Sequence, residues 1–188
     1  MPRVADPQAR DRVLDAATWL FYERGTRGVG MNEVITVAGC GKNLAYSHFP
    51  SKDDLVAEYL QRFLDAREQA AVAAAAAAGP DPKRQIIAIL TEAAEQILSP
   101  RFRGCAARNY VVESRGAPDR GTEIARAYLR RARRALRKRV AATGVAEPER
   151  VADRIWIVME GLYSMGVHLG PRRDLVTEGL SLVEELLR

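Results

Sequence analysis

The chain has 188 residues, of which 47% are hydrophobic and 28% charged, and its net charge is +5. This length fits one large domain or a small module joined to a larger one, and the composition excludes collagen-like and wholly disordered proteins. No apolar run approaches the roughly 18 residues of a membrane-spanning helix, and residues 1–12 lack the apolar centre of a signal peptide. We therefore expect a cytoplasmic protein.

Apolar residues recur at helical spacing along almost the whole chain, and strand-like alternation is missing. Glycine and proline clusters divide this pattern into nine helical segments, so we predict an all-α fold. The first segment carries an apolar stripe formed by Val13, Ala17, Leu20 and Phe21. Two short segments follow, 31–38 and 42–49, and they are too small to be stable without the first as a third wall.

A long helix is expected to begin near Lys52. Ser51 and Asp54, three residues apart, are typical of a capping box, and Pro50 ends the preceding segment. The far end of this helix is an alanine-rich run before Gly79, which we interpret as helix because alanine has the best helix propensity.

The positive charge is concentrated in one later segment. From Arg126 to Arg139 there are eight basic residues and no acidic one, which exceeds the net charge of the whole chain. Residues 1–56 hold seven basic and seven acidic side chains. Overall basicity is therefore no evidence that the N-terminal part binds nucleic acid, and we expect 126–139 to form a solvated helix face.

Two stretches, AATWLFYERG at 16–25 and AGCGKNLAYSHFPSKDDLV at 38–56, resemble the DNA-binding domain of the TetR family of bacterial transcriptional regulators. The resemblance covers roughly residues 10–56, and the rest of the chain agrees in length and helical layout. It implies a three-helix helix-turn-helix DNA-binding domain at 1–51, joined to a larger helical domain for effector binding and dimerisation at 52–188.

In a helix-turn-helix the second short helix enters the major groove with its polar or small side chains outward. On the segment from Lys42, four side chains share one face, namely Lys42, Asn43, Tyr46 and Ser47, while Ala45 and Phe49 share the opposite one. Lys42 can reach guanine or phosphate, Asn43 can pair with adenine, and Leu44 can touch a thymine methyl group. The resemblance adds Tyr46, His48 and Lys52 as phosphate contacts.

The sequence also departs from the family pattern. Gly30 stands where threonine is usual, so a phosphate donor is lost, and Cys40 and Gly41 replace the common Val-Ser, so the next helix lacks a side-chain cap. Ile35 and Ala45 stand where alanine and leucine are usual, and we interpret this pair as a volume-compensating swap in a small core.

A DNA reader of this kind is expected to be a homodimer, because two recognition helices must meet successive turns of the duplex. The last two helical segments carry more apolar surface than one small domain can bury. The predicted interface consists of Ile155, Met159, Leu162, Gly166, Leu175, Gly179, Leu182 and Leu186. A second stripe on each segment leaves open which side faces the partner, namely Trp156, Tyr163 and Val167, and Val176, Leu180, Val183 and Leu187.

Residues 104–113, GCAARNYVVE, resemble a segment in the effector half of some members of the family. Effector sites in helix bundles combine apolar walls with a few polar groups. The predicted effector-binding residues are Cys105, Asn109, Tyr110, Trp156, Met159 and Tyr163, and the alternative is that they are ordinary core.

The favoured function is a homodimeric repressor that leaves a palindromic operator when a small-molecule effector binds, with the signal carried by the helix from Lys52 as the only segment touching both halves. No catalytic residue, cofactor or metal site is predicted, since phosphate-binding glycine loops and the HExxH and GxSxG motifs are absent from the sequence. Two alternatives remain: a thiol-based sensor or enzyme centred on Cys105, with His168 as its partner, and a helical sensor module whose DNA reader has decayed.

Overall fold

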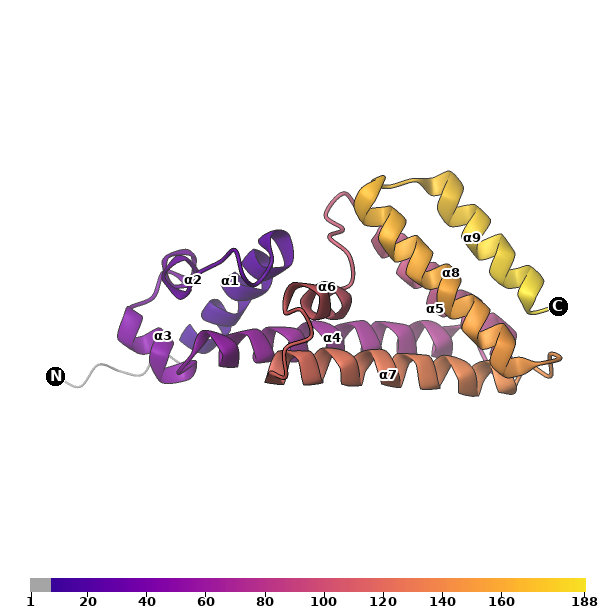
Figure 1. Ribbon diagram of the computed structural model, residues 1–188, viewed down its shortest axis with the longest axis horizontal. Coiled ribbons are helices and arrows are strands. Elements are labelled where there is room, and N and C mark those ends of the chain that lie inside the picture. Colours follow the sequence, from indigo (N-terminus) through magenta and orange to yellow (C-terminus); the bar gives the residue numbers. More distant parts are fainter. Residues whose placement is uncertain (1–7) are drawn as a thin grey trace. The chain divides into compact units, whose positions relative to one another are not determined.

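The computed structural model describes residues 8–188, which form nine helices and contain no strand (Figure 1). The prediction of an all-α protein is confirmed. The helices are α1 (Ala9–Arg24), α2 (Met31–Ala38), α3 (Lys42–His48), α4 (Lys52–Ala77), α5 (Pro82–Ile97), α6 (Ala106–Glu113), α7 (Arg120–Ala141), α8 (Pro148–His168) and α9 (Arg173–Leu186). The first seven residues of the predicted DNA-binding domain lie outside the described part of the chain.

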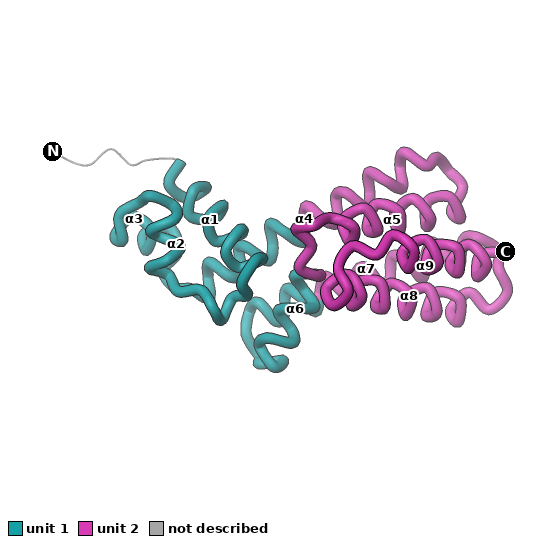
Figure 2. Tube along the Cα trace, turned by 90° about the horizontal axis from the view of Figure 1, so that it is seen from above, with its two compact units in different colours: residues 1–64, 106–126 teal, residues 65–105, 127–188 magenta. Residues whose placement is uncertain are grey.

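The helices divide into two compact units (Figure 2). Unit 1 contains the chain up to residue 64 together with 106–126, and unit 2 contains 65–105 and 127–188. The first turns of α4 belong to unit 1 because they pack on α1, where the rings of Phe21 and Tyr59 meet edge to face at 5.6 Å. Helix α7 also contributes to both units, so α4 is not the only segment that does. The functional boundary between residues 51 and 52 stays a prediction.

Local signals decide where several helices begin and end. The Ser51 hydroxyl accepts a hydrogen bond from the backbone N–H of Asp54 at 3.1 Å, so the predicted side-chain cap is present, and it donates a hydrogen bond to the Asp54 carboxylate at 2.7 Å. Helix α4 continues through the alanine-rich run, and Gly79 follows it with a φ of 81°. The Asp81 carboxylate accepts from the N–H of Lys83 at 2.9 Å and caps α5.

In unit 1, α1, α2 and α3 enclose a small apolar core. Its buried side chains include Val13, Ala17, Leu20 and Phe21 from α1, Val34 and Ile35 from α2, Ala45 from α3, and Phe49. The predicted stripe of α1 therefore faces inward as expected. An ion pair between Arg24 and Glu33 also joins the end of α1 to α2.

The core of unit 2 is larger and is built mainly by α5, α8 and α9. Its buried side chains include Ile86, Leu90 and Ile97 from α5, Ile155, Met159 and Leu162 from α8, and Val176 and Val183 from α9. Close packing explains two of its glycines. A Cβ atom at Gly166 would lie 2.7 Å from Ile97, and one at Gly179 would lie 2.8 Å from Leu162.

This burial corrects part of the predicted subunit interface. Ile155, Met159, Leu162 and Gly166 are buried inside unit 2, so they have little surface left for a second subunit. The reason is that α5 and α9 cover this side of α8. On α9 the second stripe faces inward, and the predicted interface residues keep surface: Leu182 is 46% exposed, and Leu175, Gly179 and Leu186 are partly buried.

Candidate nucleic-acid interface

Helices α2 and α3 form a helix-turn-helix around Gly39. Gly39 has a left-handed φ of 60° and ends α2 by donating its N–H to the carbonyl oxygens of Ile35 and Thr36. Helix α3 is held to the core by its inward side, where Ala45 is 0% exposed and Phe49, directly after the helix, is 1% exposed. Apolar packing alone therefore fixes which side of α3 faces outward.

The outward side of α3 is polar. Lys42, Asn43 and Ser47 are exposed, and Leu44 and Tyr46 are partly buried. The Lys42 ammonium lies 5.9 Å from the centre of the Tyr46 ring, and the Ser47 hydroxyl donates to the Leu44 carbonyl at 2.7 Å. Within residues 8–188, no other hydrogen bond or ion pair occupies the side chains of this face. The residues predicted to contact bases are thus together and available.

The three predicted phosphate contacts differ in accessibility. Tyr46 and Lys52 are partly exposed, and Lys52 is the first residue of α4, where free backbone N–H groups also favour an anion. His48 is different because its Nε2 atom is buried without a hydrogen-bond partner among the described residues. A phosphate contact from His48 would therefore have to use Nδ1.

The two glycine caps behave as the sequence indicates. Gly30 and Gly41 are the N-cap residues of α2 and α3, and neither helix has a side-chain hydrogen bond at its start. A Cβ atom at either position would meet nothing within 4 Å. The backbone therefore has room for the threonine or serine that the family pattern leads one to expect there.

The six predicted effector residues do not share one unit. Asn109 and Tyr110 belong to unit 1, whereas Cys105, Trp156, Met159 and Tyr163 belong to unit 2. Asn109 is exposed, and the Tyr110 hydroxyl is hydrogen-bonded to Asp119 Oδ1 at 3.2 Å. Burial, together with the nearby Asp119 carboxylate, raises the pKa of Tyr110 above its ordinary value. Tyr110 thus serves the packing of unit 1.

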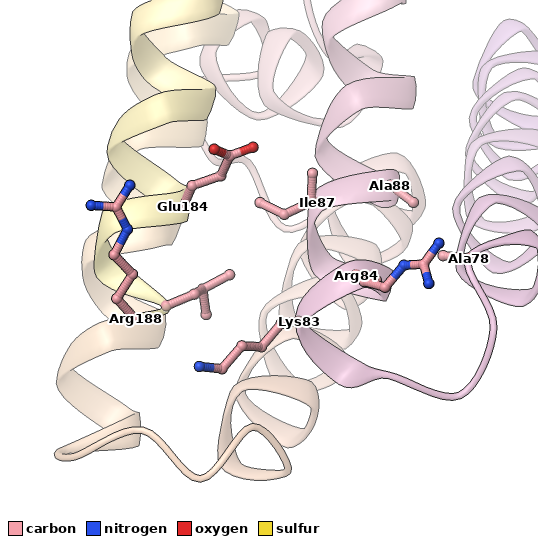
Figure 3. A pocket seen from close by; sticks show the side chains of 8 residues that line it. Ala78, Lys83, Arg84, Ile87, Ala88, Glu184 and Arg188 are labelled. Atoms are coloured by element: carbon pink, nitrogen blue, oxygen red, sulfur yellow. The ribbon is translucent and has the colours of Figure 1, made fainter.

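Within unit 2, the phenyl ring of Phe102 packs against Tyr163 at 5.9 Å, and Met159 lies in the core. Unit 2 also has a cavity of about 520 Å³ between the start of α5 and the end of α9, with Lys83, Ile87 and Glu184 among its lining residues (Figure 3). None of the predicted effector residues lines this cavity.

The residues of the thiol alternative are placed differently from what that chemistry requires. Cys105 is 8% exposed, whereas an attacking thiol needs access. His168 is exposed on α8, and its Nδ1 lies 3.4 Å from the Ser164 hydroxyl. Across the described residues, no group of three or more His, Cys, Asp or Glu side chains is arranged to hold a metal ion. In the same range no helix is long and apolar enough to cross a membrane.

Two polar contacts were missed by the sequence analysis. In unit 1 the Glu113 carboxylate binds the loop between α1 and α2, accepting from Thr26 and Arg27. In unit 2, Arg67 of α4 forms a two-pronged ion pair with Glu92 of α5, with N to O distances of 2.9 and 2.5 Å. Both contacts join residues far apart in the chain, so no local spacing could have revealed them.

Comparison with known proteins places the helix-turn-helix in a family. The family model described as bacterial regulatory proteins, tetR family, matches residues 13–59. The chain is 43% identical over 54 residues to an uncharacterized HTH-type transcriptional regulator of Mycobacterium tuberculosis, a match that covers 29% of this chain and 27% of that protein. It is 41% identical over 56 residues to the HTH-type transcriptional repressor KstR2 of Rhodococcus jostii, covering 30% and 28%. The matched segment thus spans less than a third of either relative.

A solved structure extends the likeness beyond the helix-turn-helix. The crystal structure of a TetR-family transcriptional regulator from Streptomyces coelicolor superimposes with a TM-score of 0.91 at 26% sequence identity. The superposition covers 96% of this chain and 89% of that chain.

Proposed function

Because the chain belongs to the TetR family of bacterial regulatory proteins, we propose that it is a homodimeric repressor that binds a palindromic operator through α3 and leaves it when a small-molecule effector binds. The name of the Rhodococcus relative, a transcriptional repressor, supports repression as the direction of control.

The observation that carries this proposal is the separation of the two faces of α3. Its inward residue Ala45 is buried, while outward Lys42 and Asn43 are exposed and make no hydrogen bond or ion pair with another side chain among residues 8–188. Polar groups left unsatisfied by the protein suit the donors and acceptors on the base edges of the major groove. In the proposed complex Lys42 binds guanine or phosphate and Asn43 binds adenine.

Phosphate contacts set the register of the complex in this proposal. Tyr46, Lys52 and the Nδ1 atom of His48 bind backbone oxygens, and the start of α4 adds its free N–H groups. The absence of a threonine at Gly30 removes one such contact. Affinity therefore depends on few phosphate contacts per subunit, and it should fall with salt with a slope that scales with their number.

The proposed dimer uses exposed apolar side chains of α9 and α8. Leu182 of α9 and Ile157 of α8 are 46% and 68% exposed, which is unusual for large apolar side chains in a unit with a well-filled core. A second copy of the chain would cover them and supply the twofold axis that a palindromic operator requires.

The effector site is proposed to lie in unit 2, with Trp156 and Tyr163 as walls. An effector that binds one arrangement of the helices better than another would shift the population toward it. Helices α4 and α7, which contribute residues to both units, are the proposed carriers of this shift.

A gel-shift titration of purified protein against the DNA flanking its own gene tests the proposal. We expect sequence-selective binding that weakens with salt, and a loss of about 5- to 10-fold for Lys52→Ala with a salt slope smaller by about 1. Lys83→Ala in unit 2 removes the same charge and is the matched control, with unchanged binding. Wild-type protein that shows no preference for any flanking sequence would refute the proposal.

A further inference from the structure

The end of α6 is tied to the loop that precedes the helix-turn-helix, and both segments lie in unit 1. Glu113, the last residue of α6, accepts hydrogen bonds at 3.1 Å from both the backbone N–H and the hydroxyl of Thr26, and at 2.5 Å from the N–H of Arg27. The Arg27 guanidinium in turn donates to the Glu113 carbonyl at 3.2 Å. Two residues of the loop thus converge on one side chain.

The loop is shaped around this carboxylate. Thr26 is only 7% exposed and is one of the few buried polar residues of the described chain. Gly25 begins the loop with a φ of 77°, and a Cβ atom there would lie 3.0 Å from Glu113 Oε1. A larger residue at Gly25 would therefore be strained and would also crowd the carboxylate. Without Glu113, the buried donors of Thr26 would have no acceptor.

Helix α6 is itself anchored at the same end. The Tyr110 hydroxyl and the backbone N–H of Thr122 are both within hydrogen-bond distance of Asp119 Oδ1, at 3.2 and 2.7 Å. The Ser114 and Thr122 hydroxyls lie 3.0 Å apart. These contacts fix α6 against the start of α7, so Glu113 projects from a braced position.

The loop is also close to a proposed DNA contact. Thr26, Arg27, Lys52 and Tyr110 line one cavity of about 230 Å³ in unit 1. The loop leads directly into α2, whose N-cap, Gly30, offers no side chain to fix it. Glu113 is therefore the side-chain acceptor that orders the backbone just before the helix-turn-helix.

We propose that Glu113 is a positioning residue for DNA binding, which acts by fixing the loop of residues 25–30 and so pre-orders α2 and α3 for the operator. The inference rests on the proposed function, because it concerns operator affinity. Groups held in place before binding lose less freedom in the complex. A variant that loses the Glu113 contact has a more mobile loop and should therefore bind the operator more weakly.

The test compares Glu113→Gln with Glu123→Gln, which removes the same charge from an exposed side chain of α7. Glutamine keeps the shape but has a single acceptor oxygen, so it cannot satisfy both Thr26 and Arg27. We expect the Thr26 and Arg27 amides of the DNA-free protein to exchange about tenfold faster in Glu113→Gln, and operator affinity to fall about tenfold. Glu123→Gln should match wild type within about twofold.

A second pair of variants approaches the contact from the loop side. Thr26→Val removes the hydroxyl and should weaken operator binding, whereas Thr26→Ser keeps it and should restore wild-type affinity. A substitution that only destabilises the fold would lower the melting temperature. Affinity is therefore compared at a temperature where every variant is folded.

The outcomes separate this inference from the function it rests on. Wild-type protein that binds no DNA selectively overturns both. Selective wild-type binding with Glu113→Gln and Thr26→Val at wild-type affinity overturns the positioning role alone. Unchanged amide exchange at Thr26 and Arg27 in Glu113→Gln overturns it as well, because the contact would then not order the loop.

Discussion

Polar side chains serve opposite purposes in α3 and in unit 2. On α3 they point outward without side-chain hydrogen-bond partners in the described chain, and apolar packing by Ala45 and Phe49 holds the helix. In unit 2, Arg67 and Glu92 point toward each other, with 20% of each side chain exposed, and join α4 to α5. Packing and the proposed DNA recognition are thus separated between the two faces of α3, whereas in unit 2 the polar groups themselves stabilise the fold.

The largest effect on stability is expected from Phe49, whose buried ring holds α3 to the core of unit 1. Phe49→Ala should lower the free energy of unfolding by about 3–5 kcal/mol, because the ring is almost fully buried and its loss leaves a cavity. Chemical denaturation measures this change in the free energy of unfolding. Val37→Ala on α2 is the control, since Val37 is 51% exposed and its truncation should change stability by less than about 0.5 kcal/mol. Equal losses of stability in the two variants would contradict the claim that apolar packing by Phe49 holds α3.

The swap between Ile35 and Ala45 offers a sharper test of the same core. Ile35→Ala should destabilise by about 2–4 kcal/mol through a cavity, and Ala45→Leu by about 1–3 kcal/mol through overpacking. If the two side chains compensate in volume, the double variant should lose clearly less than the two single losses together. Unchanged melting of Ile35→Ala, or strict additivity in the double variant, would show that they fill separate spaces.

In unit 2 a polar substitution should affect stability. Burial lowers the pKa of Arg67, but the hydrogen bond and charge of Glu92 outweigh it and raise this pKa above its ordinary value. Glu92→Gln leaves the guanidinium without its carboxylate and should destabilise by about 1–3 kcal/mol, less than a fully buried pair because water screens part of it.

Glu95→Gln, on the exposed side of α5, is the control and should be nearly neutral. If thermal unfolding shows Glu92→Gln to be as stable as this control, unit 2 does not depend on the pair, and the contrast with α3 fails.

The smallest effect on stability is expected at the exposed ion pairs that join Arg133 and Arg137 of α7 to Asp153 of α8. Hydrogen bonds from Arg133 and then Arg137 hold the pKa of Asp153 below its ordinary value of 3.8. The stabilisation is therefore present above that value and is lost as the pH falls through the lower pKa of the folded state. Asp153→Asn should be slightly less stable than wild type at pH 7, and denaturation curves should converge in acid. A gap that widens in acid would contradict this sign.

Local features of the fold could be predicted from the sequence because periodicity and capping depend on near neighbours. The stripe of α1, the side-chain cap at Ser51 and the two faces of α3 are of this kind. Which helix covers which apolar stripe could not be predicted: α8 is apolar on two sides, and the spacing alone does not tell that α5 and α9 cover Ile155 and Leu162. The same limit applies to contacts such as Glu113 with Thr26, which are 87 residues apart.

The residues proposed to be functional differ in the same way. Those on α3 were found together because a short motif contains them all. The proposed effector residues were gathered from two distant segments, 105–110 and 156–163, and Tyr110 proved to be hydrogen-bonded to Asp119 within unit 1.

The most direct test of the outward face of α3 is the affinity of Asn43→Ala for operator and scrambled DNA, measured beside its melting temperature. Our account predicts operator binding weaker by about 5- to 100-fold, scrambled DNA bound as before, and an unchanged melting temperature, because Asn43 is exposed and without a side-chain partner. Equal affinity of the variant and wild type for the operator, with the protein folded, would contradict it.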